Sequence, residues 1–299
     1  MSSAPGQDLF RTENLRRRQA VNKLAELSAV AAAFLAVGLL VIVVASVAKR
    51  GLGAISIDFL TKNPSPSLLI GETAESGIAN AIVGTAIIVG LAVLMALPVG
   101  VLAAIYLNEF APKRVANVLT LALDVLNGIP AIVLGIFVFV FLVVGEGQAA
   151  WKGSLALAIL MLPLIARSTQ EVLALVPESL REASLALGAA KWRTTLSVVL
   201  PQTIGGIVTG ATLATARAAG ETAPLLFTTS LVGNELQTDP SKALASMPMF
   251  IFTSAEQADP VLHEQAWGAA LVLIVMILVL SVVARAAATR SRRRLAGSR

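Results

Sequence analysis

Two arginines, Arg167 and Arg217, interrupt long apolar segments of this sequence, and each is followed four residues later by a glutamate, Glu171 and Glu221. A guanidinium stays charged at physiological pH, and its planar fork of N–H donors matches the oxygens of phosphate and carboxylate groups. Such a charge inside a membrane costs roughly 2.5–3.5 kcal/mol on insertion scales, so it usually faces a polar path. The four-residue spacing also lets each glutamate neutralise its arginine on one helix face. The pattern therefore leaves two interpretations, an oxyanion pathway or self-neutralised ion pairs.

Small residues precede Arg217 at helical spacing. Gly206, Gly210 and Ala214 form a face that allows another helix to approach closely. The same face continues to Arg217 and Glu221. We therefore expect these two charges to point towards a packed partner or a central path, and away from lipid.

The two arginines are expected at different depths. At about 1.5 Å per residue, Arg167 lies about 20 Å from the outer end of its segment and Arg217 about 24 Å from the inner end of its own. In a hydrocarbon core of about 30 Å these positions are about 14 Å apart along the membrane normal. We interpret them as two stations along a route. Asp124 and Asn127 line the interior or mark a shallow inner segment, and the sequence does not decide between these two.

The elements that carry these residues belong to a membrane protein. The chain has 299 residues, of which 56% are apolar and 14% charged, with a mean hydropathy of +0.81. Soluble domains carry about 25% charged residues, so an ordinary soluble fold is excluded. The absence of cysteine excludes disulfides and thiolate sites. The single histidine, His263, is expected to be solvated in an outer loop. No Ser/His/Asp set supports an intramembrane enzyme, and no Walker-type loop for ATP is present.

The hydropathy pattern predicts an all-α polytopic protein with six spans. Each span needs about 20 mostly apolar residues. The first is longer than the hydrophobic region of a signal peptide, so we expect it to be retained. The predicted spans are 28–48, 77–107, 115–144 (interrupted at 127–130), 154–176, 200–221 and 267–285.

Lysines and arginines in the loops predict the orientation. With a cytoplasmic N-terminus, the inner segments hold 16 of these residues and the outer segments hold 5. We therefore expect both termini in the cytoplasm, with an N-terminal tail over 1–27 and a basic tail over 286–299. A basic tail next to a span is interpreted as an orientation signal and not as a nucleic-acid site.

The inner loop over 177–201 predicts a short helix. Pro177 and Glu178 are typical of a helix start, and Gly188 of a helix end. One face is predicted to be largely apolar, with Arg181 and Glu182 projecting elsewhere. The residues of that face are Leu180, Ala183, Ser184 and Leu187. Amphipathicity alone fits either docking to a cytoplasmic partner or a helix lying on lipid.

The same loop resembles the cytoplasmic signature of permease subunits of ATP-binding-cassette (ABC) importers. That signature reads Glu-Ala-Ala, three residues, Gly, nine residues, Ile-x-Leu-Pro. This chain has Glu182-Ala183-Ser184, Gly188 and Val198-Val199-Leu200-Pro201 at the same spacing. Serine replaces the second alanine and valine replaces isoleucine. The resemblance implies that Glu182, Ala183, Gly188, Leu200 and Pro201 couple the permease to an ATPase.

Three further segments look like the phosphate-specific PstA-type permeases, namely 80–85, 216–227 and 246–251. The resemblance implies a type I importer permease fold with its core over 77–285, in a bacterial inner membrane. It implies a second, PstC-type permease, an ABC ATPase dimer and an extracytoplasmic phosphate-binding protein as partners, with lipid around the chain. ATP and Mg²⁺ would be bound by the ATPase, and this chain would hold no cofactor and no metal. Arg167, Arg217 and Glu221 would line the phosphate path.

The outer segment over 222–266 contains apolar pieces at 225–231 and 247–252 that are too short to cross a membrane. We expect them to form a gate or a docking surface. Two alternatives to a phosphate importer remain open at this point. One is a permease for another solute, such as another oxyanion or a polyamine, although intramembrane arginines argue against a cation. The other is an ATP-independent channel or secondary transporter, which would not explain the signature.

Overall fold

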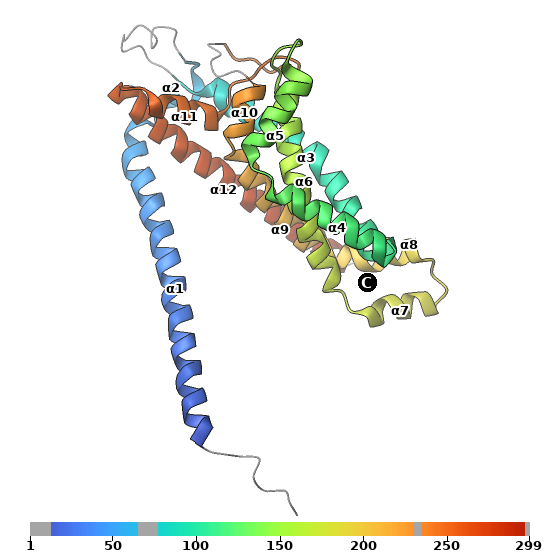
Figure 1. The fold of residues 1–299 in the computed structure, drawn as a ribbon. Helices are drawn as coiled ribbons and strands as arrows, with labels where there is room; N and C mark the ends of the chain where they lie inside the picture. The colour runs from blue at the N-terminus through green and yellow to red at the C-terminus, as the bar shows by residue number, and fades with distance from the viewer. Residues whose placement is uncertain (1–12, 65–76, 230–234, 297–299) are drawn as a thin grey trace, which may run out of the picture. The chain divides into compact units, whose positions relative to one another are not determined.

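The computed structural model describes residues 13–64, 77–229 and 235–296, and all regular secondary structure within them is helical (Figure 1). The all-α prediction is confirmed. The chain divides into two units, 1–50 and 51–299. The helices, with π and 3-10 segments marked η, are α1 (Glu13–Gly51), η1 (Leu52–Ala54), α2 (Ile57–Thr61), α3 (Ala79–Ile105), η3 (Tyr106–Phe110), α4 (Lys113–Gly128), α5 (Ala131–Val138), η4 (Phe139–Val143), α6 (Ala150–Ala174), α7 (Glu178–Ala186), α8 (Lys191–Thr194), η5 (Thr195–Val199), α9 (Leu200–Ala219), α10 (Ala223–Thr228), α11 (Met247–Glu256) and α12 (Pro260–Ala296).

Among the described residues, five helical stretches are long and apolar enough to cross a membrane. They are Arg17–Ala54, Ala79–Phe110, Ala150–Ala174, Lys191–Ala219 and Pro260–Arg290. Each contains most of one predicted span. The helices extend beyond the predicted apolar segments because the more polar residues at their ends are also helical.

The predicted span over 115–144 consists of two helices that together are long and apolar enough for one broken span, and the break lies at the predicted interruption. Lys113–Gly128 and Ala131–Val143 are bent by 95°. Pro130 has no N–H, and its ring forces the preceding Ile129 into an extended conformation, with φ −71° and ψ 128°. The second helix has 13 residues and a length of about 20 Å, so it is too short to cross the core alone.

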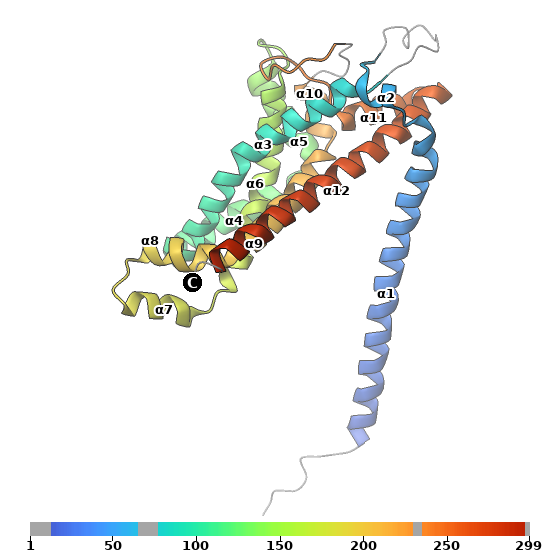
Figure 2. The same cartoon turned by 180° about the vertical axis from the view of Figure 1, so that it is seen from behind.

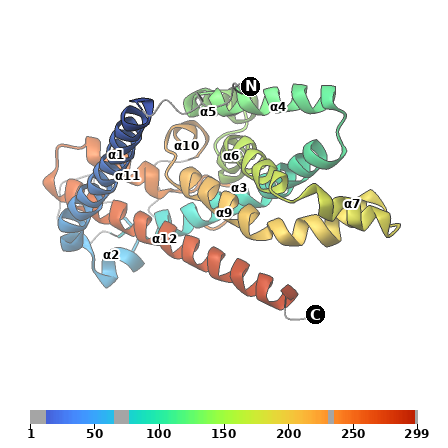
Figure 3. The same ribbon diagram turned by 90° about the horizontal axis from the view of Figure 1, so that it is seen from below.

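The core of the unit over 51–299 is built from α3, α6 and α9. Its buried residues are small or branched, among them Ala92, Ala96, Leu157, Met161 and Ala214. Small residues permit the close backbone approach on which helix association in lipid depends. Seen from below in Figure 3, α9 lies between α6 and α12, with which it makes its main contacts.

The loops of this unit gather at opposite ends. α7, α8 and the C-terminal end of α12 lie at one end, and α2, α10 and α11 lie at the other (Figures 1 and 2). This arrangement agrees with the predicted inner loop over 177–199, the predicted outer segment over 222–266 and the predicted inner tail. The outer apolar pieces form α10 and most of α11, although residues 230 and 231 lie outside the described residues.

α11 packs into the core at the outer end. Met247 and Met249 are fully buried, and the Met247 backbone N–H donates to Thr85 Oγ1 at 2.8 Å. Gly84, next to Thr85, leaves room for the backbone of the loop before α11, because a Cβ at Gly84 would lie 2.0 Å from the Ala245 carbonyl oxygen. The first half of α11 is therefore part of the bundle, and Phe252 in its second half is exposed.

Candidate functional site

The inner loop folds into the short helix that the sequence predicts. Pro177 caps α7 in an extended conformation, with φ −58° and ψ 138°. At the other end Gly188 has φ +82°, a left-handed conformation that favours glycine. The Gly188 N–H donates to the Leu185 carbonyl at 2.9 Å and the Ala189 N–H to the Ser184 carbonyl at 3.2 Å. These two bonds form a Schellman motif, so Gly188 ends the helix as predicted.

The structure shows which face of α7 meets the bundle. Leu187 is 90% exposed and Leu180 is also exposed, whereas the Arg181 side chain is only 12% exposed. The sequence predicted an apolar face that meets either a cytoplasmic partner or lipid, and the exposed leucines agree with both alternatives. Arg181 faces inwards because protein acceptors satisfy its donors there. Glu182 and Ala183 are exposed, so α7 presents them together with apolar side chains on its outer surface.

Arg181 makes four hydrogen bonds that join three elements. Its Nη1 donates to the Val176 carbonyl at 2.6 Å and to Glu178 Oε2 at 3.2 Å. Its Nη2 donates to the Leu173 carbonyl at 2.9 Å and to Glu109 Oε1 at 3.0 Å. The two carbonyls belong to the end of α6 and the residues that follow it, where a cation is favoured by the helix dipole. Glu109 lies in η3, so this one side chain connects α7 to α6 and to the end of α3.

Leu200 and Pro201 begin α9 and are half-buried. They follow the π segment η5. Pro201 has no N–H to donate to the carbonyl of the fourth residue before it. The wider π turn also relieves the clash between the proline ring and that carbonyl. The Gln202 side chain also donates to the Val198 carbonyl at 3.0 Å. These residues fix where α9 begins, while the surface open to a partner is carried by α7.

Arg167, on α6, is paired with Asp124 on α4. Its Nε donates to Asp124 Oδ1 at 2.8 Å, and its Nη2 contacts both carboxylate oxygens. The self-neutralised pair with Glu171 is therefore not the arrangement found, since Arg167 bonds to a carboxylate on another helix. Asp124, which the sequence left undecided, is the partner of Arg167. Both side chains are partly open to the surroundings.

Arg217 and Glu221 form the ion pair that their spacing allows, with Nε and Oε1 3.5 Å apart. Arg217 is nevertheless 54% exposed. It belongs to a strip of α9 in which exposed residues recur every three, four or seven positions. These residues are Gln202, Thr209, Leu213, Arg217 and Gly220. Arg217 is the charged residue of this strip, and a charge on a membrane-level helix requires cover other than lipid.

The packing of α9 on α6 fixes the relative levels of the two arginines. A Cβ at Gly210 would lie 2.2 Å from Ser168 Oγ, and one at Gly206 would lie 2.5 Å from Val172. The small-residue face is therefore in contact with α6, and the two helices run antiparallel. In this register Arg167 lies opposite residue 211 of α9. Arg217 is six residues further along, or about 9 Å. The separation of about 14 Å predicted from the sequence is therefore too large. It was counted from the predicted ends of the spans, which do not locate the membrane boundaries accurately.

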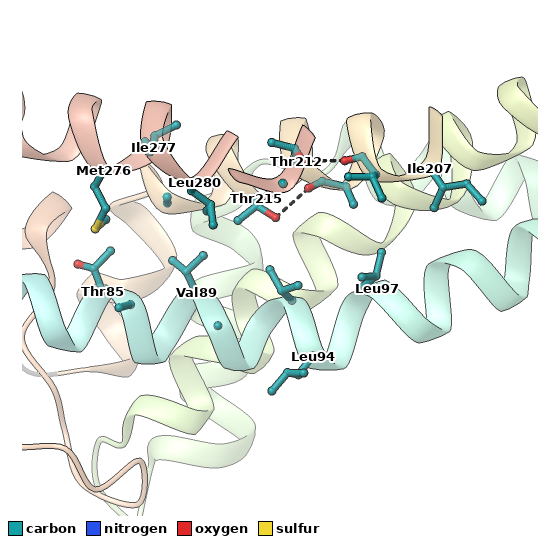
Figure 4. Close-up of a pocket in the computed structure, with 17 residues that line it drawn as sticks. Thr85, Val89, Leu94, Leu97, Ile207, Thr212, Thr215, Met276, Ile277 and Leu280 are labelled. Carbon is teal, nitrogen blue, oxygen red and sulfur yellow. Dashed lines mark hydrogen bonds between the residues drawn. The ribbon is translucent and has the colours of Figure 1, made fainter. Parts of the chain in front are cut away.

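A groove of about 630 Å³ lies between α3, α9 and α12 (Figure 4). Its lining is apolar apart from Thr85, Thr212 and Thr215. The Thr212 and Thr215 hydroxyls donate to carbonyls of their own helix at 2.7 and 2.8 Å. The lining contains no charged residue, so a desolvated oxyanion would meet no counter-charge in this groove. Arg217 lies on another face of α9.

Sequence reasoning missed Glu109 and the inward role of Arg181. The sequence shows that the Glu109 carboxylate lies just beyond a predicted span. A single charge in that position is expected to be solvated, so it did not indicate a buried ion pair. Its partner is 72 residues away in the chain, so spacing rules could not connect them. His263 is exposed near the start of α12, as expected of a solvated residue.

The family model for the binding-protein-dependent transport system inner membrane component matches residues 96–297. Two solved structures share the fold. One is titled as the inward-facing MetNI methionine ABC transporter, with a TM-score of 0.52, 20% identity and coverage of 77% of this chain and 96% of that chain. The other is a bacterial ABC transporter involved in the import of the polysaccharide alginate. Its TM-score is 0.60, with 14% identity and coverage of 94% of this chain and 99% of that chain.

Curated relatives match most of the sequence. Phosphate transport system permease protein PstA from Yersinia pestis is 36% identical over 279 residues, which cover 91% of this chain and 93% of that protein. PstA 1 from Mycobacterium tuberculosis is 40% identical over 233 residues, 75% of each chain. The molecule is accordingly a multi-pass bacterial inner-membrane protein with the ABC importer permease fold. The chain belongs to the binding-protein-dependent transport system inner membrane component family and, within it, to the PstA-type permeases.

Proposed function

We propose that this chain is a permease subunit of an ATP-driven importer of inorganic phosphate. It pairs with a second, PstC-type permease to form the path. An ABC ATPase dimer binds ATP and Mg²⁺ and hydrolyses the nucleotide, and an extracytoplasmic binding protein delivers the anion. This chain supplies part of the pathway and the lever that the ATPase moves. Its membership of the PstA-type permeases is the observation that carries the proposal.

The geometry of α7 supports the ATPase partner. The helix stands at one end of the bundle and exposes Glu182, Ala183 and the apolar Leu187. A side chain as exposed as Leu187 gains by burial against a partner, and a full leucine burial contributes about 1.5–3 kcal/mol. An ATP-independent transporter or channel has no use for such a lever.

The two arginines support an anionic solute. Each carries a carboxylate partner, Asp124 for Arg167 and Glu221 for Arg217. An arriving phosphate has to displace or share these carboxylates, so its net binding energy is reduced. A path needs sites that bind an ion strongly enough to admit it and weakly enough to release it. Arginines that already have carboxylate partners are suited to both conditions, which supports the proposed pathway role.

The proposal is tested on the assembled complex. The chain is purified in mild detergent with its sister permease and ATPase, reconstituted into proteoliposomes and supplied with the binding protein. We expect labelled phosphate to be taken up only with ATP, and sulfate or a polyamine not to compete. Uptake without ATP would contradict the importer, and preferred uptake of another solute would contradict the substrate.

The pathway residues are tested by Arg167→Gln and Arg217→Gln. Hydrogen bonds to a charged group contribute about 1.5–3 kcal/mol, so losing one is expected to weaken phosphate handling by about 10- to 100-fold. Arg114→Gln, which removes an exposed cation at the start of α4, is the matched control and should leave uptake unchanged. Normal uptake in both the Arg167 and Arg217 variants would refute the pathway role.

A further inference from the structure

The π segment η3, at the inner end of α3, contacts both short helices of the inner loop. Glu109 receives the Nη2 donor of Arg181 on α7 at 3.0 Å. The next residue, Phe110, lies under the Lys191 ammonium of α8, with 5.5 Å from Nζ to the ring centroid. Two adjacent residues at the end of one long helix therefore hold two successive helices of the loop.

Burial shows that the first of these contacts is not a surface ion pair. The Glu109 side chain is 6% exposed and that of Arg181 is 12% exposed. Asn108 Nδ2 also donates to Glu109 Oε1 at 2.8 Å. An exposed pair has little effect because water screens it, whereas removing one partner of a buried pair leaves an uncompensated charge. Glu178, the other carboxylate that Arg181 contacts, is 72% exposed and provides an internal comparison.

The π geometry explains how Glu109 reaches α7. A π turn rotates the residues that follow it relative to a continuous α-helix, and such turns are frequent at functional sites. The chain then ends the segment at Phe110, and the Ala111 N–H donates to the Tyr106 carbonyl at 2.8 Å. A polar hollow of about 430 Å³ separates η3 from α7 and α8, and Glu109, Arg181 and Lys191 are among its lining residues. The contacts are thus discrete bridges across a hollow and not part of a continuous packed core.

We propose that η3 is the anchor of the coupling loop, with Glu109 and Arg181 as positioning residues that make α7 move together with α3. This inference rests on the proposed function, because it takes α7 as the element that the ATPase moves. Without Glu109, α7 is still held by the chain at its two ends, by the bonds of Arg181 to the Leu173 and Val176 carbonyls and by the Ser184–Thr194 hydroxyl contact at 2.9 Å, but none of these contacts reaches α3. Movement of α7 would then be absorbed by the hollow and would reach α3 only weakly.

The experiment measures phosphate imported per ATP hydrolysed by the reconstituted complex. Glu109→Ala and Arg181→Ala are expected to keep the ATPase bound and hydrolysis running while this ratio falls at least fivefold. Arg181→Lys, which keeps the charge and loses the fork, should restore the ratio in part. Glu178→Gln is the control and should retain the wild-type ratio. Unchanged ratios in both alanine variants would overturn the proposal.

A second measurement tests the anchor if the alanine variants assemble poorly. The chain has no cysteine, so the double variant Glu109→Cys/Arg181→Cys carries the only thiols of this subunit. A short bifunctional thiol reagent should restore the ratio that the double variant has lost, and a single-cysteine variant should not respond. Failure of the cross-link to restore coupling would overturn the proposal. If the wild-type complex moves no phosphate, the proposed function fails, while the anchor is still tested by whether the cross-link changes the ATPase rate.

Discussion

Substitutions of Gly188 distinguish two reasons for a glycine at the end of α7. One is the left-handed backbone conformation, and the other is a partner surface that leaves no room for a side chain. Its φ of +82° is left-handed, and a Cβ built there would meet nothing within 4 Å. Any side chain therefore fits within this chain, and the cost of substitution is backbone strain alone. For an L-residue that strain is about 1–2 kcal/mol. Asparagine, which is enriched in left-handed conformations, should cost less, and a β-branched valine should cost more.

The expected series is glycine, asparagine, alanine and valine in order of decreasing function. A cost of about 1.4 kcal/mol corresponds to a tenfold change in the equilibrium between the closed and the frayed last turn of α7. Hydrogen exchange of the Gly188 and Ala189 amides, which make the Schellman bonds, reports that equilibrium directly. Co-purification of the ATPase and phosphate uptake report its consequence. We expect uptake to follow the exchange rates across the series.

Two results would refute this reasoning. If asparagine abolishes ATPase binding while the amides of α7 stay protected, Gly188 is needed because the partner tolerates no side chain there. If valine leaves both exchange and uptake unchanged, the left-handed turn is not what positions the helix. Gly220→Ala, at a glycine with φ −98° in the same chain, is the control for a glycine without left-handed strain.

Three further substitutions test the packing. Gly210→Val should unfold or loosen the bundle, because its Cβ would lie 2.2 Å from a side chain of α6, whereas Thr209→Val at the exposed neighbouring position should be tolerated in a thermal-melting assay. Thr85→Val leaves the buried Met247 N–H without an acceptor, so we expect a loss of about 1–3 kcal/mol and faster protease cleavage near α11. Lys152→Met removes a buried ammonium that donates to two carbonyls, at 2.6 and 3.0 Å, and a lower melting temperature at neutral pH should reveal it. An unchanged melting temperature in Gly210→Val, Thr85→Val or Lys152→Met would contradict the contact that the variant is designed to break.

The spans and the helix signals of the inner loop could be predicted because they depend on local properties. Hydropathy over about 20 residues identifies a span, and a proline and a glycine mark the start and end of a helix. Gly188 occupies the predicted C-terminal position, and the helix begins one residue after Pro177. The bend at Pro130 could be located but its size could not, because the angle depends on what the two halves pack against.

The partners of the charged residues could not be predicted in the same way. Arg167 bonds to Asp124, 43 residues away, and not to the glutamate that follows it by four. Residue spacing along one helix identifies only ion-pair partners on that same helix, and it cannot identify a partner on another helix. The face of α7 that meets the bundle could not be assigned either, because an amphipathic pattern shows that two faces differ but does not show which one meets the bundle. In this helix the buried face is set by Arg181, whose donors find acceptors in α6, in the residues after α6 and in η3.

The positions of charge support our proposal that an anion passes along the α6–α9 side of this subunit and not through the groove of Figure 4. The groove is roomy but its lining is uncharged, and the Thr212 and Thr215 hydroxyls are engaged with their own helix. Charge costs least where other charges or water compensate it. Arg167 and Arg217 both have carboxylate partners and both remain partly open, about 9 Å apart along the helix axes. An apolar groove of this kind suits contact with lipid or with another helix, while two open, partnered arginines at successive levels suit an anion that is passed from one to the other.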